Sequence, residues 1–379
     1  MDGAYLDHHT PTPLHPAARE ALIEALDRFG DPLRSHAVGR EADNALEDAR
    51  DRLAAAIGAQ PGEILFTSGG TESVALAVWW LTRARGEGRV VTSAVEHPAV
   101  LGAGRALADQ GFEVVQAPVD PEGKLDLDRY LDLVRSPGTV LASVQHANHE
   151  VGTLQPVAEA ASLAHEAGAA FHTDACQTVG HLPVDVRSLE VDLLSLSGRK
   201  FGGPPGVGTL FVRTGVTLPV REGDDRERRR RPGAPNLPGI VAMAAALDAA
   251  SAELSDEAGR LWALTTRLRA GLEAIEGVSL HGHPTQRTPH LVCWSAEGVD
   301  PEALFEALDE RGFRLDAGSV ATGSVDEPSP VLEAMGTPDT IAFRIGCGRD
   351  TTEEVVDRLL TELRPLIAEL QHFEQTSRR

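Results

Sequence analysis

Residues 195–209 read Ser-Leu-Ser-Gly-Arg-Lys-Phe-Gly-Gly-Pro-Pro-Gly-Val-Gly-Thr, which places a lysine in a tight loop between two apolar segments. Residues 191–196 have the length and composition of a buried strand, and residues 208–212 are typical of a second one. An amine held in such a loop loses part of its hydration, which lowers its pKa and favours imine formation. Because a lone lysine is usually an exposed surface residue, the interpretation of Lys200 depends on the motifs that accompany it.

Two motifs upstream of the lysine fall where an α/β protein builds a ligand site. Asp174 comes at the end of the apolar segment 169–174, and ligands of open α/β sheets bind outside the carboxyl ends of the strands. A carboxylate at that place can pair with a protonated pyridine nitrogen. Gly69 and Gly70 join a strand at 63–67 to a predicted helix, whose free N–H groups form a seat for phosphate.

A histidine, His97, ends a third predicted strand, where its imidazole could stack on an aromatic ring. Taken singly, each of these features is common in proteins without a cofactor. A phosphate seat, a ring stacker, a partner for a pyridine nitrogen and an imine-forming lysine, in this order, are a far more specific set. Together they indicate an aromatic, phosphorylated cofactor bound through Lys200.

With these motifs the chain resembles the cysteine desulfurases of class V aminotransferase type, which are pyridoxal-phosphate (PLP) enzymes of fold type I. The resemblance runs nearly end to end and is carried also by residues 5–8, 34–42, 145–152, 231–236 and 344–354. It implies a homodimer, because the sites of this family are built at the subunit boundary. It also implies a small amino acid as the substrate.

Strands and helices alternate from residue 63 onward, which predicts an α/β fold with a mainly parallel, seven-stranded sheet covered on both faces. By resemblance, this sheet belongs to a large PLP-binding domain, residues 15–245. Residues 1–14 and 246–379 would form a smaller α+β domain. A long helix from about residue 239 to 275 is expected to connect the two.

Carried over position by position, the resemblance assigns roles to individual residues. Lys200 would hold PLP and, together with His97, perform catalysis. The expected cofactor-binding residues are Gly70, Thr71, His97, His149, Asp174, Gln177, Ser197, Arg199 and Lys200. Arg344 would clamp the α-carboxylate of the substrate in a two-pronged geometry, and Asn148 is the second expected substrate-binding residue.

Four positions depart from the family pattern: His149, Arg199, Ala234 and Ala321. Ala321 decides the chemistry. In the desulfurases a mobile loop carries a cysteine, which attacks the substrate sulfur and leaves as a persulfide. Alanine has no nucleophile, so this step cannot run through the matching loop, residues 317–329. The exchange is either natural divergence, which the other three departures favour, or an engineered change.

None of the three cysteines, Cys176, Cys293 and Cys347, is typical of a replacement nucleophile, because each falls in a segment predicted to be buried. We therefore expect cleavage of the C–S bond of cysteine or a related small amino acid, with the persulfide step in doubt. Two alternatives stay open at this point. One is an aminotransferase of the same fold, and the other is a catalytically silent scaffold that binds PLP.

Composition narrows the class of protein. The 379 residues are 42% hydrophobic, enough for a sizeable core, and contain no apolar run of about 18 residues that would predict a membrane span. A formal net charge of −22 argues against nucleic acid as a partner. The three cysteines match neither a disulfide framework nor a metal site, and no secretion signal begins the chain, so we expect a cytoplasmic protein without metal.

One basic run, residues 226–231, opposes the acidic trend. It is typical of a solvated loop. The alternative is a docking site for an acidic partner, such as a protein that accepts sulfur.

Overall fold

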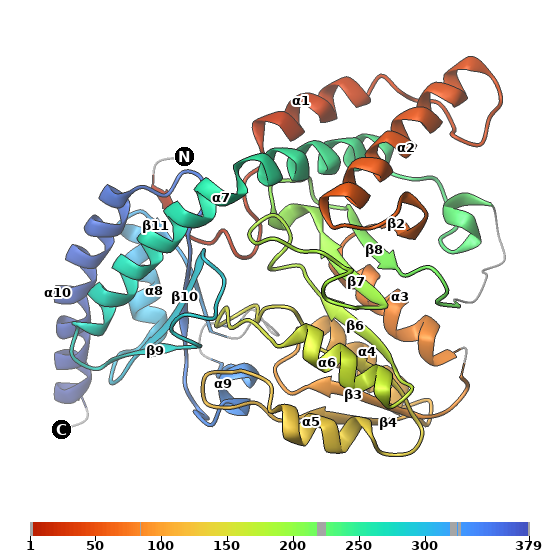
Figure 1. Ribbon diagram of the computed structural model, residues 1–379. Coiled ribbons are helices and arrows are strands. Elements are labelled where there is room, and N and C mark those ends of the chain that lie inside the picture. The colour runs from red at the N-terminus through yellow and green to blue at the C-terminus, as the bar shows by residue number, and fades with distance from the viewer. Residues whose placement is uncertain (1–2, 84, 218–224, 319–323, 325–326, 378–379) are drawn as a thin grey trace.

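The computed structural model describes residues 3–83, 85–217, 225–318, 324 and 327–377. Its centre is a seven-stranded sheet with the order β2-β8-β7-β6-β5-β3-β4 (Figure 1). The pairs are parallel except at β8, which runs antiparallel to both of its neighbours. The mainly parallel sheet expected from the sequence is thus confirmed. The strands are β2 (Ile64–Thr67), β3 (Arg89–Ser93), β4 (Glu113–Ala117), β5 (Thr139–Ser143), β6 (Ala170–Asp174), β7 (Leu193–Ser197) and β8 (Gly208–Val212).

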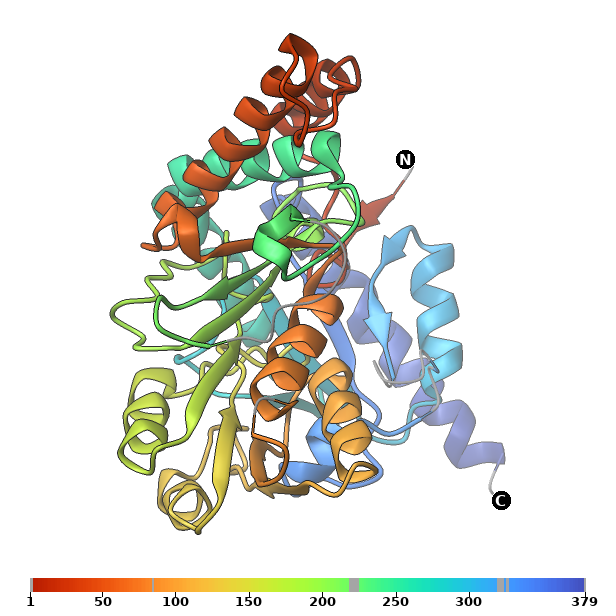
Figure 2. The same ribbon diagram turned by 90° about the vertical axis from the view of Figure 1, so that its right-hand side faces the viewer.

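Helices cover both faces of this sheet (Figure 2). One face carries α3 (Gly70–Arg83) and α4 (Pro98–Ala108), and the other carries α5 (Leu127–Val134) and α6 (Val157–Glu166). Successive strand residues point to opposite faces. Leu193 therefore belongs to the apolar cluster under α3 and α4, and Leu194 to the cluster on the other side. This double burial explains why the central strands are apolar without alternation.

Local signals set where the helices begin. His97 caps α4, its Nδ1 accepting a hydrogen bond from the backbone N–H of Ala99 at 3.1 Å, and Pro98 occupies the first helical position, where its missing N–H has no cost. Asp126 caps α5 in the same way through the N–H of Arg129. These caps hold the strand-to-helix turns on the carboxyl side of the sheet.

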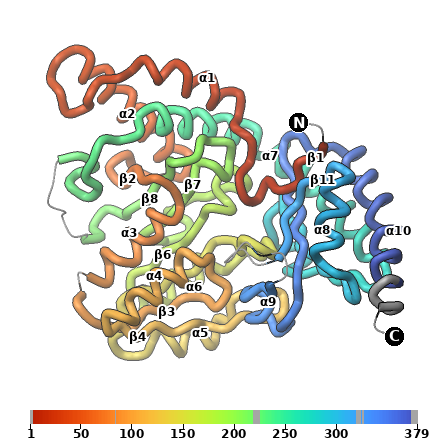
Figure 3. The backbone as a smooth tube through the Cα atoms, turned by 180° about the vertical axis from the view of Figure 1, so that it is seen from behind, coloured from red at the N-terminus to blue at the C-terminus, as the bar shows by residue number. Residues whose placement is uncertain are grey.

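The second lobe is built on a four-stranded antiparallel sheet with the order β12-β13-β10-β9. Trp294 and Phe343 stack in its core, with ring centroids 4.8 Å apart. Seen from behind, the N-terminal strand β1 lies beside β11, to which it pairs in parallel (Figure 3). The elements are β1 (Ala4–Tyr5), β9 (Val278–His281), β10 (Leu291–Ala296), α8 (Pro301–Glu310), β11 (Phe313–Arg314), β12 (Asp316–Ala317), α9 (Pro330–Ala334), β13 (Phe343–Gly346) and α10 (Glu353–Ser377).

The long helix α7 (Leu237–Glu273) joins the two lobes, and α1 (Pro16–Ala25) and α2 (Ala37–Ala56) pack against it. Its first turns are buried in the core of the large sheet and its last turns in the core of the second lobe. A window of α7 with mean hydropathy 1.4 is long and apolar enough to cross a membrane by composition alone. Half of that window is buried inside the protein, so burial in a core accounts for its apolar character.

Several elements differ from the sequence-based expectation. The helix α5 and the strand β9 were not predicted, and neither were the two-residue strands β1, β11 and β12. The expected boundary between residues 245 and 246 falls inside α7, and the domain division stays a prediction.

Part of the basic run contacts the chain itself. Arg226 forms an ion pair with Asp31 at 2.9 Å, and Arg231 with Glu72, also at 2.9 Å. These arginines therefore bind acidic groups of the same molecule.

Candidate active site

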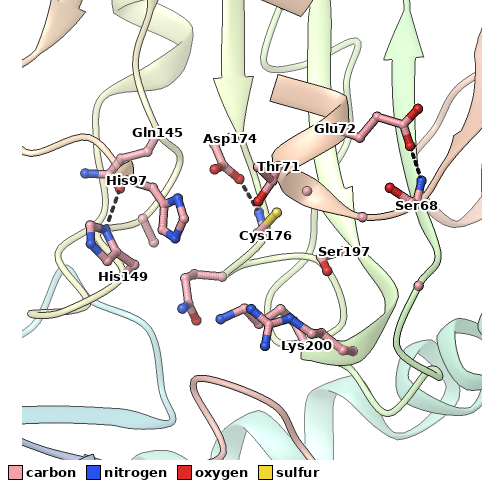
Figure 4. A pocket seen from close by; sticks show the side chains of 16 residues that line it. Ser68, Thr71, Glu72, His97, Gln145, His149, Asp174, Cys176, Ser197 and Lys200 are labelled. Atoms are coloured by element: carbon pink, nitrogen blue, oxygen red, sulfur yellow. Dashed lines mark hydrogen bonds between the residues drawn. The ribbon is translucent and has the colours of Figure 1, made fainter. Parts of the chain in front are cut away.

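A cavity of about 200 Å³ lies at the carboxyl ends of the central strands (Figure 4). Its wall brings together segments from β2 to β8 that are far apart in the sequence. All nine residues expected to bind the cofactor line it: Gly70, Thr71, His97, His149, Asp174, Gln177, Ser197, Arg199 and Lys200. The roles assigned to them stay predictions, but their convergence on one cavity is a property of the fold.

One end of the cavity is built for an anion. The turn from β2 into α3 presents the N-terminus of a 14-residue helix, whose first N–H groups have no partner within the helix. A Cβ atom on Gly70 would lie 2.5 Å from Sγ of Cys176, so only glycine fits there. Ser197 borders the same turn, and the exposed Arg199 adds a positive charge to this end of the cavity.

Asp174 ends β6, and its side chain faces the cavity from the sheet. Its Oδ1 accepts a hydrogen bond from the backbone N–H of Cys176 at 3.0 Å, and the residue is 8% exposed. This bond fixes the carboxylate in one orientation. A fixed, nearly buried carboxylate is suited to hold a protonated ring nitrogen.

Lys200 follows β7 in a short 3-10 turn, Gly198–Lys200. Its Nζ donates a hydrogen bond to the carbonyl oxygen of His9, 2.6 Å away. Burial, assisted by the positive charge of Arg199, lowers the pKa of this amine to about 8. Near neutral pH, the uncharged, nucleophilic form of Lys200 is therefore much more populated than that of an exposed lysine.

Two histidines lie at the other end of the cavity. The rings of His97 and His149 meet edge to face, with centroids 5.0 Å apart and planes at 71°. Burial lowers the pKa of both, which keeps the rings neutral. Since Nδ1 of His97 accepts the capping bond from Ala99, the proton of its neutral ring is on Nε2.

Gln177 lies on the cavity wall with its amide already engaged. Its Nε2 donates to the carbonyl oxygen of His9 at 3.0 Å, and its Oε1 lies 3.4 Å from Nε2 of His290. The His9 carbonyl therefore accepts hydrogen bonds from both Gln177 and Lys200.

The two expected substrate-binding residues are not part of the cavity lining. Asn148 is fully buried, donates to the Val95 carbonyl at 3.0 Å, and accepts from the N–H groups of Glu150 and Val151 at 2.8 Å each. Arg344 is also fully buried and is held by acidic groups. Their substrate-binding roles stay predictions.

None of the three cysteines has the environment of a thiolate. Cys176 lines the cavity, but burial and the neighbouring Asp174 raise the pKa of its thiol well above its usual value. Burial raises the pKa of Cys293 and Cys347 to about 12. Ala321, the position matched to the loop cysteine, lies outside the described residues.

The resemblance implies that the N-terminal arm lies across the site, but sequence reasoning gave no role to His9 of this arm or to Asp316 of β12. Asp7, His9 and Asp316 each place one ligand-type atom within 4.8 Å of the others, in an arrangement that could hold a metal ion. However, Nε of Arg344 donates to Asp316 at 2.8 Å and supplies positive charge there. The two consecutive histidines after Asp7 were a sequence signal that could have singled out residues within this arm.

Comparison with known proteins places the chain in a family. Residues 4–359 match the family described as aminotransferase class-V. The chain is 40% identical to the cysteine desulfurase IscS of Methanosarcina thermophila, over 97% of this chain and 93% of that protein. It is 37% identical to the cysteine desulfurase NifS of Azotobacter vinelandii, over 98% and 94%. A solved structure of a NifS-like protein superposes with a TM-score of 0.90 and 32% identity, covering 97% of this chain and all of the other.

Proposed function

The chain belongs to the aminotransferase class-V family, and on this premise we propose that it is a PLP-dependent enzyme that cleaves the C–S bond of cysteine or a related small amino acid. The observation that carries the proposal is the convergence of Lys200, Asp174 and the Gly70 turn on one cavity. An imine-forming amine, a ring-nitrogen partner and a phosphate seat are the three anchors that PLP requires.

The residues present fit this cofactor. Gly70 adds no side chain of its own to the turn, as close approach of a phosphate to the backbone demands. Asp174 is fixed by the N–H of Cys176, and Lys200 is held on the same cavity by the His9 carbonyl. We infer that Gly70, Thr71, Ser197 and Arg199 hold the phosphate, and that His97, His149 and Gln177 contact the ring and its oxygen.

When bound, PLP supplies an electron sink that stabilises negative charge on the α-carbon of an amino acid. The protein supplies the proton transfers. Lys200, with its pKa lowered to about 8, can take the α-proton near neutral pH and return it. His97 presents its Nε2–H from the neutral ring and is oriented by its bond to Ala99.

The absence of a cysteine at position 321 determines the products that we expect. In the desulfurase route the sulfur passes to a thiol and the remaining carbon skeleton leaves as alanine. Without that thiol, loss of the α-proton and breakage of the C–S bond release sulfide, and water then converts the remainder to pyruvate and ammonia. Since the pKa values of Cys176, Cys293 and Cys347 are raised, these thiols are poor substitutes for the missing nucleophile.

We further propose that the protein is a cytoplasmic homodimer. Large apolar side chains are exposed on and after α1, with 52% of Ile23, 63% of Leu26, 85% of Phe29 and 50% of Leu33 open to solvent. A cluster of this kind favours a protein interface, and a second copy is the partner that the family resemblance implies. A sulfur-acceptor protein would be a partner only if the persulfide route operates, and two arginines of the basic run are already paired with Asp31 and Glu72.

Two measurements test the function. Borohydride reduction followed by peptide mapping should place a pyridoxyl group on Lys200, and K200A should lose it. Purified protein incubated with L-cysteine or L-cystine should release pyruvate together with sulfide or a persulfidic product in solution. Alanine as the product, with a persulfide on the protein, would restore the ordinary desulfurase route. A spectral change confined to conversion of the cofactor to its amine form, with a keto acid released, would favour the aminotransferase.

A further inference from the structure

Acidic groups from two parts of the chain already occupy Arg344. Its Nε donates to Oδ2 of Asp316 at 2.8 Å, and its Nη1 donates to Oε2 of Glu150 at 3.3 Å and to the carbonyl oxygen of Gly318 at 2.7 Å. Asp316 lies directly opposite Arg344 in the β12–β13 pair. The remaining nitrogen, Nη2, is buried without a hydrogen-bond partner among the described residues. The guanidinium thus has its charge balanced but keeps one unused donor.

The same region holds three carboxyl groups for one guanidinium. Asp7, Glu150 and Asp316 surround Arg344 and the buried His9. The α-carboxylate of an amino acid would add a further negative charge. It can gain a two-pronged contact with the guanidinium only if one of the resident carboxylates gives way.

Glu150 and Asp316 differ in how easily they could leave. The side chain of Glu150 is 2% exposed and also accepts a hydrogen bond from Oγ of Ser329 at 2.5 Å. The side chain of Asp316 is 28% exposed and belongs to a strand of only two residues. Water can therefore replace the partners of Asp316 at lower cost than those of Glu150.

Asp316 is also connected to the cavity through His9. Nε2 of His9 lies 3.3 Å from Oδ2 of Asp316, and the carbonyl oxygen of His9 accepts the hydrogen bond from Lys200. His9 thus contacts both Lys200, the expected imine lysine, and Asp316, the carboxylate that pairs with Arg344. A change at one end of this chain of contacts reaches the other through a single residue.

We propose that Asp316 is an internal occupant of the site for the substrate carboxylate, and that its displacement sets the affinity for amino acids. The inference rests on the proposed function, in which Arg344 receives that carboxylate. In the resting protein Asp316 neutralises the arginine. An amino acid binds by taking over the Nε donor and the unused Nη2 donor, while Asp316 turns to solvent.

The test uses Asp316→Asn, which preserves the shape of the side chain and removes its charge. The PLP-loaded protein is titrated with L-alanine, which has no sulfur to lose, and with ethylamine, its counterpart without the carboxylate. Absorbance of the cofactor reports binding of either amine. We expect D316N to bind L-alanine about tenfold more tightly than the unmodified protein does. The neutral side chain of the variant competes less strongly than a carboxylate for the guanidinium of Arg344. Affinity for ethylamine should stay the same.

Asp357→Asn is the matched control, because Asp357 pairs with Arg267 through two bonds of 2.6 Å on the exposed side of α10, far in sequence from the cavity segments. D357N should bind both amines as the unmodified protein does. If D316N does not fold, D316A serves the same comparison.

Unchanged or weaker binding of L-alanine by the folded Asp316 variants would overturn the inference while leaving the proposed function intact. An equal gain for ethylamine would also overturn it, since the effect would then not depend on the carboxylate. If the unmodified protein carries no PLP on Lys200, the proposed function itself fails and this inference with it.

Discussion

The Nζ atom of Lys200 lies 2.6 Å from the carbonyl oxygen of His9, although 191 positions separate the two residues in the sequence. A carbonyl oxygen only accepts hydrogen bonds, so Lys200 is the donor. The N-terminal arm therefore reaches the cavity with its backbone and holds the amine in place. To react with an aldehyde, the amine must give up this bond.

The reactivity of Lys200 should depend on pH in a way that reports its surroundings. The pKa of the amine in the cofactor-free protein is lowered to about 8, mainly by burial and then by Arg199. The reactive, neutral form increases as the pH rises, so labelling by pyridoxal should be half-maximal near pH 8. R199Q removes a positive charge and should move this midpoint to higher pH, while R199K should leave it nearly in place. A midpoint unaffected by R199Q would contradict the role of Arg199. Pyridoxal, which lacks the phosphate, keeps phosphate contacts out of the comparison.

Glu96 should make stability decrease with rising pH. The residue is 1% exposed, and burial raises its pKa to about 8 from 4.5, although Ser93 and the N–H of Gln145 donate to it. The folded state therefore keeps a proton that the unfolded state loses, and the stability present below pH 4.5 is lost as the pH rises to about 8. E96Q should equal the unmodified protein below this window and exceed it above, by on the order of 5 kcal/mol.

Denaturant unfolding of the cofactor-free protein at several pH values measures this difference. E113Q is the control, since Glu113 is exposed and pairs with Arg89 at the sheet edge. Parallel pH curves for E96Q and the unmodified protein would show that Glu96 is ionised in the fold.

The buried pair of Arg50 and Glu227 should contribute strongly to stability. Both side chains are 5% exposed and are joined by bonds of 2.9 and 3.1 Å, and the N–H of Phe66 also donates to Glu227. E227A leaves a buried guanidinium without this partner, and we expect a loss of about 3–5 kcal/mol in the free energy of unfolding.

The exposed pair of Arg52 and Asp248 provides the comparison. D248A should cost less than about 1 kcal/mol, because water screens the charges. Similar losses in E227A and D248A would mean that burial does not govern the strength of these pairs.

Restoring a thiol at position 321 should change the products. A321C places a cysteine at the position that the family resemblance matches to the loop cysteine. We expect part of the sulfur from L-cysteine to appear as a persulfide on this variant, with alanine released. Mass spectrometry of the intact protein, before and after reduction, detects the added sulfur. A321S is the matched control and should form none. Persulfide of equal amount on the unmodified protein would show that another thiol performs this step.

The sequence was sufficient for the central sheet because its strands are apolar on both faces and lie between regular helices. The strand from Leu193 to Ser197 and the turn after it follow directly from the pattern around Lys200. Short elements were missed for the opposite reason. The strands β1 and β11 have two residues each and exist only because the N-terminal arm lies beside residues 313–314.

Part of the site could likewise be predicted from the sequence, and part could not. The positions expected to bind the cofactor lie next to strand ends, and a strand end can be located from the sequence alone. The pairing of Arg344 with Asp316 and Glu150 could not be predicted, because it depends on how β12 aligns with β13 and on where the Glu150 turn meets the second lobe. Charge patterns give no information on such register.

The helix α7 has a consequence for how the molecule comes apart. Leu237 and Leu247 belong to one apolar cluster and Leu261 and Leu272 to the other, all on one uninterrupted helix. If either cluster unfolds, half of α7 loses the side chains against which it packs. Helix formation is cooperative, so the other half is destabilised as well. Heating should therefore give a single calorimetric peak, and a fragment that stops near residue 245 should remain a collapsed, incompletely ordered chain.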